Sequence, residues 1–243
     1  MMTTLRARTS GKNPTSLRPP EGTLEWREPV AVIPSSATTF EGFRAWVRSD
    51  DFPRRGRYAF LGEQLWVDLS LEALFTHHQI KGEFASVLTG IVKAESRGYY
   101  FHDRTRYIHP AARLSTEPDG MFVRFAAEDD GDVEYFEGED GTEFEVVGSA
   151  DMTLEVVSAS SARKDTVDLV DRYYRAGVRE YWLVDPRGDT LLFDILTRGP
   201  KGFVRMRKQS GGWMKSAVFG RSFRLTQSPD PKGRPSYALE TRP

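Results

Sequence analysis

Apolar residues recur every three or four positions in three segments of the chain, at 39–48, 71–96 and 162–176. This spacing places them on one face of an α-helix, so each segment is predicted to be a helix with one buried side. The third segment is followed by Gly177, the residue type favoured just after the last turn of a helix. The hydrophobic pattern therefore predicts three amphipathic helices.

Strand-like runs lie between and after these helices. Residues 58–69 alternate around the turn-forming pair Gly62-Glu63, which predicts a β-hairpin. Residues 190–239 carry several runs joined by Gly and Pro turns, which predict strands, and the last residues are expected to be loose. Short runs rich in apolar, β-branched and aromatic residues predict further strands at 99–109, 121–125, 151–157 and 181–184.

The order of the later elements predicts the fold class. Strand 151–157, helix 162–176 and strand 181–184 follow one another, and this connection favours a right-handed crossover between two parallel strands. We therefore expect one α/β domain over residues 38–243, with a central mixed β-sheet flanked by α-helices. Residues 1–37 are poor in apolar residues and rich in Ser, Thr, Pro, Gly and Arg, which predicts a largely disordered basic arm.

The composition excludes several classes of structural and catalytic site. The chain has 243 residues, of which 39% are hydrophobic and 28% charged, and it contains no cysteine. These values are typical of a soluble globular protein and exclude disulfide scaffolds, zinc fingers, iron–sulfur clusters and cysteine nucleophiles. The sequence has no stretch long enough to span a membrane and no signal-peptide pattern in residues 1–19, so we expect a cytoplasmic protein. It also lacks a phosphate-binding glycine loop, a GxSxG elbow and an HExxH zinc motif.

Charge is distributed unevenly along the chain. Residues 125–162 hold twelve acidic residues and no Lys or Arg, whereas residues 198–243 hold eleven basic residues against two acidic ones. A basic surface beside an acidic focus suits a metal-dependent enzyme that acts on a polyanion. Acidic runs are also common in solvated loops, and that interpretation stays open for the stretch 126–145.

Two carboxylates stand in apolar surroundings. Asp119 enters one predicted apolar strand, and Glu155 lies inside another. A buried carboxylate is costly unless it is paired or bound to a metal, and two of them on adjacent strands repel unless a divalent cation offsets their charge. The alternatives are ordinary turn chemistry for Asp119 and a salt bridge from Glu155 to Arg163 or Arg172.

The order of residues in this region resembles a known family. Its elements are Pro118-Asp119, Asp151-x-x-x-Glu155-Val156-Val157-Ser158, Asp165, Tyr173 and Ala176-Gly177-Val178-x-Glu180-Tyr181-Trp182-Leu183-Val184-Asp185-Pro186. This order resembles the PD-(D/E)xK nuclease superfamily, and more narrowly its Uma-type branch of restriction-endonuclease-like proteins. The resemblance is strongest over residues 58–225 and implies a restriction-endonuclease-like fold.

The resemblance also implies metal chemistry. Asp119 and Glu155 match the metal ligands of the family, with the backbone carbonyl of Val156 as a third oxygen and Mg²⁺ or Mn²⁺ as the cation. The family's lysine is missing, because its two usual places hold Val157 and Leu169.

A nearby cation is expected to replace this lysine. Lys164 lies close to the strand end that carries Glu155 and is the first candidate. Arg172 shares a helix face with Leu169, one turn farther along, and is the second candidate. The alternative for both is an ordinary solvated side chain on a surface helix.

Three further positions are accessory candidates under the same resemblance. Glu63 lies in the predicted hairpin turn, His78 opens the long helix, and Asp165 lies in the helix after Glu155. A histidine at the start of a helix is more often a capping or surface residue than a ligand.

The leading hypothesis is a Mg²⁺-dependent endonuclease that hydrolyses phosphodiester bonds in DNA, with Asp119, Glu155 and Lys164 as catalytic residues. One alternative is a nucleic-acid-binding protein that keeps the nuclease fold but has lost catalysis. Another is an interaction scaffold whose acidic stretch recruits a partner. A homodimer is a further hypothesis, because nucleases that cut both strands often pair two active sites by two-fold symmetry.

Overall fold

The computed structural model describes residues 32–138 and 141–243, which form two compact units, one that ends at Arg54 and one from Arg55 to Pro243. Most of the arm predicted over 1–37 lies outside the described residues. The first unit contains a 3-10 turn (Ser35–Thr38) and the helix α1 (Phe40–Val47). The Thr39 hydroxyl caps α1 by accepting a hydrogen bond from the Gly42 N–H at 3.1 Å. The helix predicted over 39–48 is thus confirmed.

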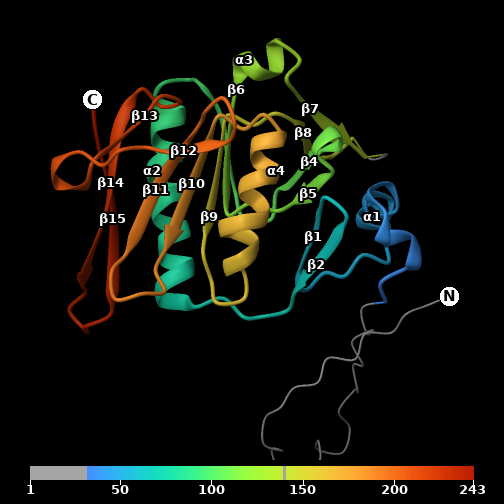
Figure 1. Cartoon of the computed structure of the whole chain (residues 1–243), viewed down its shortest axis with the longest axis horizontal. Coiled ribbons are helices and arrows are strands. Elements are labelled where there is room, and N and C mark those ends of the chain that lie inside the picture. Colours follow the sequence, from blue (N-terminus) through green and yellow to red (C-terminus); the bar gives the residue numbers. More distant parts are fainter. Residues whose placement is uncertain (1–31, 139–140) are drawn as a thin grey trace, which may run out of the picture. The chain divides into compact units, whose positions relative to one another are not determined.

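A six-stranded mixed sheet forms the centre of the second unit (Figure 1). Its strands β9 and β10 run parallel, as the crossover predicted, and its other neighbours run antiparallel. In spatial order the strands are β12 (Phe203–Arg205), β11 (Leu192–Arg198), β10 (Glu180–Asp185), β9 (Met152–Val156), β6 (Gly120–Arg124) and β3 (Gly98–His102).

Two further sheets accompany the central one. The second sheet begins with the predicted hairpin and has the order β2 (Gln64–Asp68), β1 (Arg57–Leu61), β5 (Leu114–Thr116), β4 (Arg106–His109), β8 (Glu143–Gly148) and β7 (Val133–Glu137). The third sheet has the order β13 (Met214–Ser216), β14 (Arg221–Pro229) and β15 (Pro235–Arg242).

Two helices cover opposite faces of the central sheet. Helix α2 (Gln79–Ala94) and the third sheet pack against one face in a core that includes Phe84, Trp182 and Phe223. Helix α4 (Leu169–Arg175) packs against the other face, in a second core shared with the second sheet. Figure 1 shows α2 and α4 on either side of β9 and β10. The fold is therefore the mixed α/β sheet flanked by helices that the sequence predicts.

The structure corrects three sequence predictions. The strand expected over 99–109 is two strands in different sheets, because Asp103 and Arg104 turn the chain with positive φ values of 33° and 60°. Phe125 ends no strand but begins the short helix α3 (Phe125–Asp129). The C-terminal residues are not loose, since β15 pairs with β14 up to Arg242.

The two helices that approach the ends of β6 and β9 both begin with a π-helical turn, η2 (Leu74–His78) and η4 (Lys164–Asp168). The helix predicted from residue 71 therefore begins later, and residues 71–73 lie outside any helix. A π-turn contains an extra residue and changes which side chains share a helix face, and such turns are frequent at functional sites. No helix in the described parts of the chain is long and apolar enough to cross a membrane.

Gly120 lies where two strands approach closely. A Cβ atom added there would lie 2.1 Å from the Tyr100 hydroxyl and 3.3 Å from the Leu154 side chain. Both neighbours are anchored in the sheet, so they cannot move away cheaply. Only glycine fits this position, directly after Asp119.

We expect Gly120→Ala to lower the free energy of unfolding by about 2 kcal/mol, because the added methyl group overpacks this contact. The matched control is Gly90→Ala, where nothing lies within 4 Å and alanine favours the helix, so stability should rise by up to about 1 kcal/mol. Urea unfolding of both variants measures the difference. Equal stabilities of the two variants would contradict the close approach.

Candidate active site

A cleft of about 530 Å³ lies at the end of the central sheet where β9 meets the loop before α4. It is lined by Asp119, Glu155 and Val156 from the ends of neighbouring strands and by Lys164 and Asp165 from η4. Both strands of the hairpin and the segment before α2 complete it. The cleft therefore gathers residues that lie up to about 130 positions apart, since it includes both Arg57 and Arg187.

Asp119 directly precedes β6, and Glu155 lies on the neighbouring antiparallel strand β9. Gly120 pairs with Leu154, so the same register brings Asp119 opposite Glu155. The Val156 N–H donates a hydrogen bond to Asp119 Oδ2 at 2.8 Å. Both carboxylates are buried, with exposed fractions of 5% and 2%.

Glu155 has two polar partners inside this buried environment. The Tyr173 hydroxyl donates to Glu155 Oε1 at 2.6 Å, and Lys164 Nζ lies 3.3 Å from Oε2. Burial raises the pKa of Glu155 to about 8, against the opposing effect of the Lys164 charge. The salt bridge considered with Arg163 is not formed, because Arg163 faces Asp168 at 3.8 Å.

Lys164, the first candidate to replace the family's lysine, lies in the cleft beside Glu155. Only 7% of the residue is exposed, its ammonium lies 2.7 Å from Asp165 Oδ1, and it lies 5.0 Å from the centre of the Trp66 ring. Burial alone would lower the pKa of Lys164, but the nearby carboxylates of Glu155 and Asp165 outweigh it and raise that pKa. The side chain is thus a charged ammonium held at the carboxylates.

The two usual positions of the lysine are apolar and buried. Val157 is 1% exposed and Leu169 is fully buried. Leu169 packs in the core between α4 and the sheets, among residues such as Tyr107 and Tyr181. A lysine at either position would have to displace apolar packing, which explains why the cation comes from a different residue.

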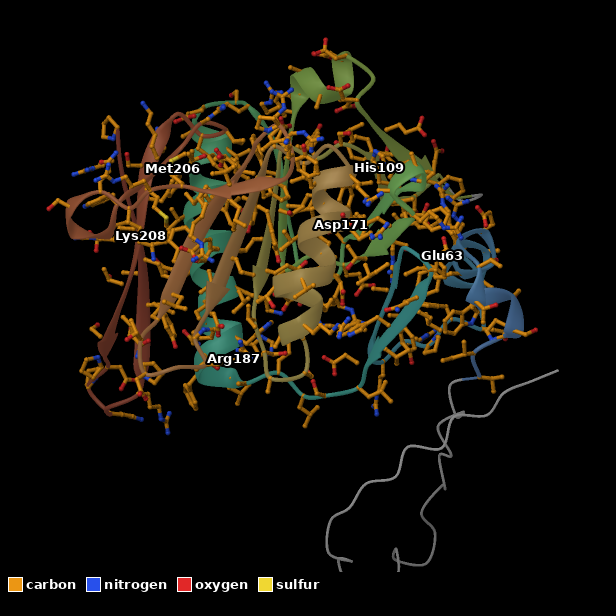
Figure 2. The ribbon with its side chains drawn as sticks, viewed as in Figure 1. Glu63, His109, Asp171, Arg187, Met206 and Lys208 are labelled. Carbon is orange, nitrogen blue, oxygen red and sulfur yellow. The ribbon has the colours of Figure 1, made fainter. Side chains whose placement is uncertain are left out.

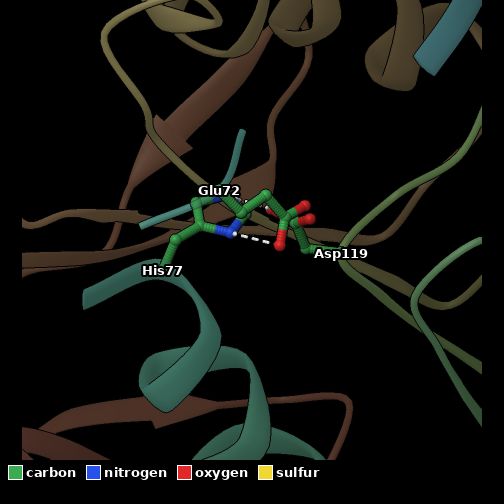
Figure 3. Close-up of side chains that lie close together, drawn as sticks. All are labelled: Glu72, His77 and Asp119. Atoms are coloured by element: carbon green, nitrogen blue, oxygen red, sulfur yellow. Dashed lines mark ion pairs between the residues drawn. The ribbon is translucent and has the colours of Figure 1, made fainter. Parts of the chain in front are cut away.

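Asp119 also belongs to a group of potential metal ligands that includes Glu72 and His77 (Figure 3). One ligand atom each from Glu72, His77 and Asp119 lie within 4.8 Å of one another. His77 Nε2 is 3.4 Å from Asp119 Oδ2, and His77 Nδ1 is 3.4 Å from Glu72 Oε2. The sequence prediction favoured His78 instead, which is half-exposed with its Nε2 3.3 Å from Glu72 Oε2.

Two cations offset the charge of these carboxylates. Lys81 Nζ lies 2.7 Å from Glu72 Oε2 and 3.7 Å from Asp119 Oδ1. Arg57 pairs with Glu72 and Asp103 and lies 3.8 Å from Asp119 Oδ1. Burial raises the pKa of Glu72, but the nearby His77, the bond from Lys81 and the charge of Arg57 outweigh burial and hold that pKa well below its ordinary value.

The donor set fits a divalent cation. Carboxylate oxygens are the ligands that Mg²⁺ and Mn²⁺ prefer, and an imidazole nitrogen suits Mn²⁺ as well. His77 Nδ1 is buried without a hydrogen bond in the described part of the structure, so the ring is held by charge more than by a fixed partner. Among the described residues, Glu72, His77 and Asp119 are the three side chains whose ligand atoms lie close enough together to hold a metal, and Glu155 lies outside this group in the same cleft.

Two accessory candidates lie away from the cleft. Glu63 has a side chain exposed to 74% and pairs with Arg113 at 2.6 Å. Arg172 donates to the Ala112 carbonyl at 3.2 Å and lines a separate hollow together with Glu63. Figure 2 shows Glu63 near the hairpin turn at the upper right, whereas Arg187, which lines the cleft, lies at the lower edge.

Asp165, the third accessory candidate, does line the cleft. It is 1% exposed, accepts a hydrogen bond from the Ser161 hydroxyl and faces Lys164. The acidic stretch contributes nothing to the cleft through its described residues, 126–138 and 141–145. These residues form α3, β7 and the first part of β8.

Sequence reasoning did not single out Glu72, His77, Lys81 or Arg57 for this site. One signal was available, because His77, Lys81 and Phe84 follow helical spacing, which puts two polar residues on the buried side of α2. No local pattern marks Arg57 or Glu72, whose partners are distant in the sequence.

Comparisons with known proteins agree with this architecture. The family described as "Uma2: Putative restriction endonuclease" matches residues 40–226. Among solved structures, a crystal structure described as a putative nuclease belonging to DUF820 from Anabaena variabilis ATCC 29413 matches with a TM-score of 0.54. The two chains are 16% identical, and the match covers 75% of this chain and 90% of the other, so it shows a shared fold. No curated protein matches the chain. Since the family match spans most of the sequence, the chain belongs to the Uma2 family of restriction-endonuclease-like nucleases.

Proposed function

We propose that this protein is a divalent-metal-dependent endonuclease, using Mg²⁺ or Mn²⁺, that hydrolyses phosphodiester bonds in DNA. The observation that carries the proposal is the pair of carboxylates, Asp119 directly before β6 and Glu155 on the paired strand β9, with the Lys164 ammonium 3.3 Å from Glu155. Two carboxylates and an ammonium in one cleft are the groups that metal-assisted phosphodiester hydrolysis uses.

Asp119 and Glu155 would hold the cation, with the Val156 carbonyl, Glu72 and His77 as further ligands. When bound, a divalent cation lowers the pKa of water and neutralises charge on the phosphodiester. The chain's own residues orient these ligands. Val156 N–H fixes Asp119, and the Tyr173 hydroxyl fixes Glu155.

Lys164 would place a positive charge beside the reacting phosphate. An ammonium in a cleft with little water stabilises the negative charge that builds up on phosphate oxygens in the transition state. Asp165 holds this ammonium at 2.7 Å and the Trp66 ring covers it, so the charge is positioned before substrate binds. Lys164 thus takes the role of the family's lysine from a different position.

Binding without catalysis is the second candidate function. Arg57 and Lys81 already offset the charge of Asp119 and Glu72, and both usual lysine positions are apolar. A protein that kept the fold and bound nucleic acid through its basic residues would have these same features. Cleavage assays separate the two candidates.

We expect the protein to nick supercoiled DNA in Mg²⁺ or Mn²⁺, and Asp119→Asn, Glu155→Gln and Lys164→Ala each to lower the rate by about 100-fold. The control is Lys215→Ala, an exposed lysine on β13 whose loss should leave the rate unchanged. Cleavage that survives both carboxylate changes would rule out this site. DNA binding without any cleavage by the wild type would favour the second candidate.

Mn²⁺ should raise the unfolding temperature of the wild type, because an ion that binds only the folded state stabilises it. Asp119→Asn and Glu155→Gln should each remove most of this increase, whereas Glu63→Gln, an exposed residue paired with Arg113, should retain it. Differential scanning fluorimetry with and without Mn²⁺ measures the effect. An increase that persists in the double variant Asp119→Asn/Glu155→Gln would place the ion elsewhere.

Without metal, Glu155 should make stability fall as pH rises. Its pKa is about 8 in the folded protein and near 4.5 when unfolded, so between these values the folded state binds the extra proton. The contribution of Glu155 to the free energy of unfolding is then fully present below about pH 4.5. It is lost as pH rises through about 8, by about 1 kcal/mol per pH unit.

The measurement for Glu155 is urea unfolding of the wild type and Glu155→Gln across this pH range in a chelator. The pKa of His77 is also raised, despite burial, by Glu72 and Asp119, and it acts in the same direction in both proteins, so the difference isolates Glu155. The wild type should lose stability relative to the variant as pH rises. A difference that does not change with pH, or that changes in the opposite direction, would show that Glu155 is ionised throughout.

A further inference from the structure

An exposed apolar segment borders the cleft. Of the twelve large hydrophobic side chains that are exposed in the described part of the chain, five lie within residues 67–75, namely Val67, Leu69, Leu71, Leu74 and Phe75. Leu71 is 97% exposed and lines the same cleft as Asp119 and Glu155. We call residues 69–75 the apolar segment. Such a concentration at one place on a surface marks a binding site.

The polar residues on either side of Leu71 are held by hydrogen bonds. Ser70 N–H donates to Asp68 Oδ1 at 2.8 Å, and the Ser70 hydroxyl lies 3.0 Å from the Ser160 hydroxyl across the cleft. Glu72 accepts a hydrogen bond from Lys81 Nζ at 2.7 Å. Ser70 and Glu72, on either side of Leu71, are thus both held by hydrogen bonds, whereas the Leu71 side chain is exposed to solvent. The exposure of Leu71 is built into the segment.

One cation contacts the apolar segment, and a second, paired with Asp185, lies in the same cleft. The Arg234 guanidinium, from the turn between β14 and β15, lies 4.3 Å from the centre of the Phe75 ring. Arg187 lines the cleft, with a side chain that is 40% exposed. Apolar side chains flanked by cations match a ligand that has both flat apolar faces and phosphates.

We propose that the apolar segment is a nucleobase-binding subsite that takes unstacked bases of the nucleic-acid substrate. This inference rests on the proposed function, because a phosphodiester held at Asp119 and Glu155 has its neighbouring nucleosides at the cleft mouth, where Leu71 lies. Leu71 and Leu74 cover the face of a base, and Arg187 and Arg234 contact the adjoining phosphates.

The subsite discriminates between nucleic-acid structures. In a regular duplex the faces of the bases are stacked on one another, so an apolar side chain reaches them only where the stack is open. Single strands and distorted sites offer free base faces, and contact with them does not depend on sequence. The apolar segment therefore favours DNA that is single-stranded or locally unpaired over intact duplex.

The test is fluorescence anisotropy in chelator, which measures binding without cleavage. The probes are labelled single-stranded oligothymidylate and a labelled duplex of the same length. Leu71→Ser should weaken binding of the single strand by about tenfold, because the contact area of a large apolar side chain is lost. Binding of the duplex should change less than about twofold. Leu71 is exposed, so this variant should fold.

The matched control is Val204→Ser on the edge strand β12, a residue that is 57% exposed and does not line the cleft. It should bind both probes as the wild type does. Equal affinities of Leu71→Ser and Val204→Ser for the single strand, or equal losses by Leu71→Ser on both probes, would overturn the subsite. A wild-type dimer in solution that Leu71→Ser dissociates would also overturn it, in favour of a contact between two copies.

Different results would contradict the proposed function and the nucleobase-binding subsite. If the wild type binds neither probe, the proposed function and the subsite fall together. If the wild type binds and cleaves DNA but Leu71→Ser binds the single strand normally, only the subsite fails.

Discussion

Two carboxylates buried at the ends of neighbouring strands are the constraint on which the site depends. Asp119 and Glu155 are 5% and 2% exposed, and an uncompensated charge in such surroundings costs several kcal/mol. The protein offsets this cost with groups of its own, the Val156 N–H, the Tyr173 hydroxyl and the Lys164 ammonium. Under the proposed function, a divalent cation would supply the remaining compensation. The groups that balance the charge of the two carboxylates are therefore the same groups that the proposed catalysis uses.

The strand register, the π-helical turns and one connecting loop together position these groups. The antiparallel register of β6 and β9 sets the carboxylates opposite each other, and the close approach at Gly120 holds the two strands in place. The π-helical turns η2 and η4 bring His77 and Lys164 to the same end of the sheet. The apolar segment joins the hairpin to η2, so the same connection that carries Glu72 into the cleft exposes Leu71 at its mouth. The proposed substrate contact and the proposed metal site thus share one loop.

Much of the fold and part of the candidate site could be predicted from sequence, and physical reasons explain which residues could be predicted and which could not. The strands around Asp119 and Glu155 were predictable because apolar runs mark buried strands, and an acid within such a run stands out. Lys164 was predictable because it lies in the first turn of the helical segment that follows β9. Arg57 and Glu72 were not, because their partners become neighbours only through the tertiary fold. The helical-face argument for Arg172 assumed regular α-helix from the start, whereas the π-turn changes which residues face the cleft.

The most direct test of the central claim is anomalous diffraction from crystals grown or soaked in Mn²⁺. The account predicts a manganese peak in contact with the carboxylates of both Asp119 and Glu155, with Lys164 remaining beside Glu155. A peak held only by the acidic residues of 126–145, or a fully occupied ion that contacts neither Asp119 nor Glu155, would contradict it.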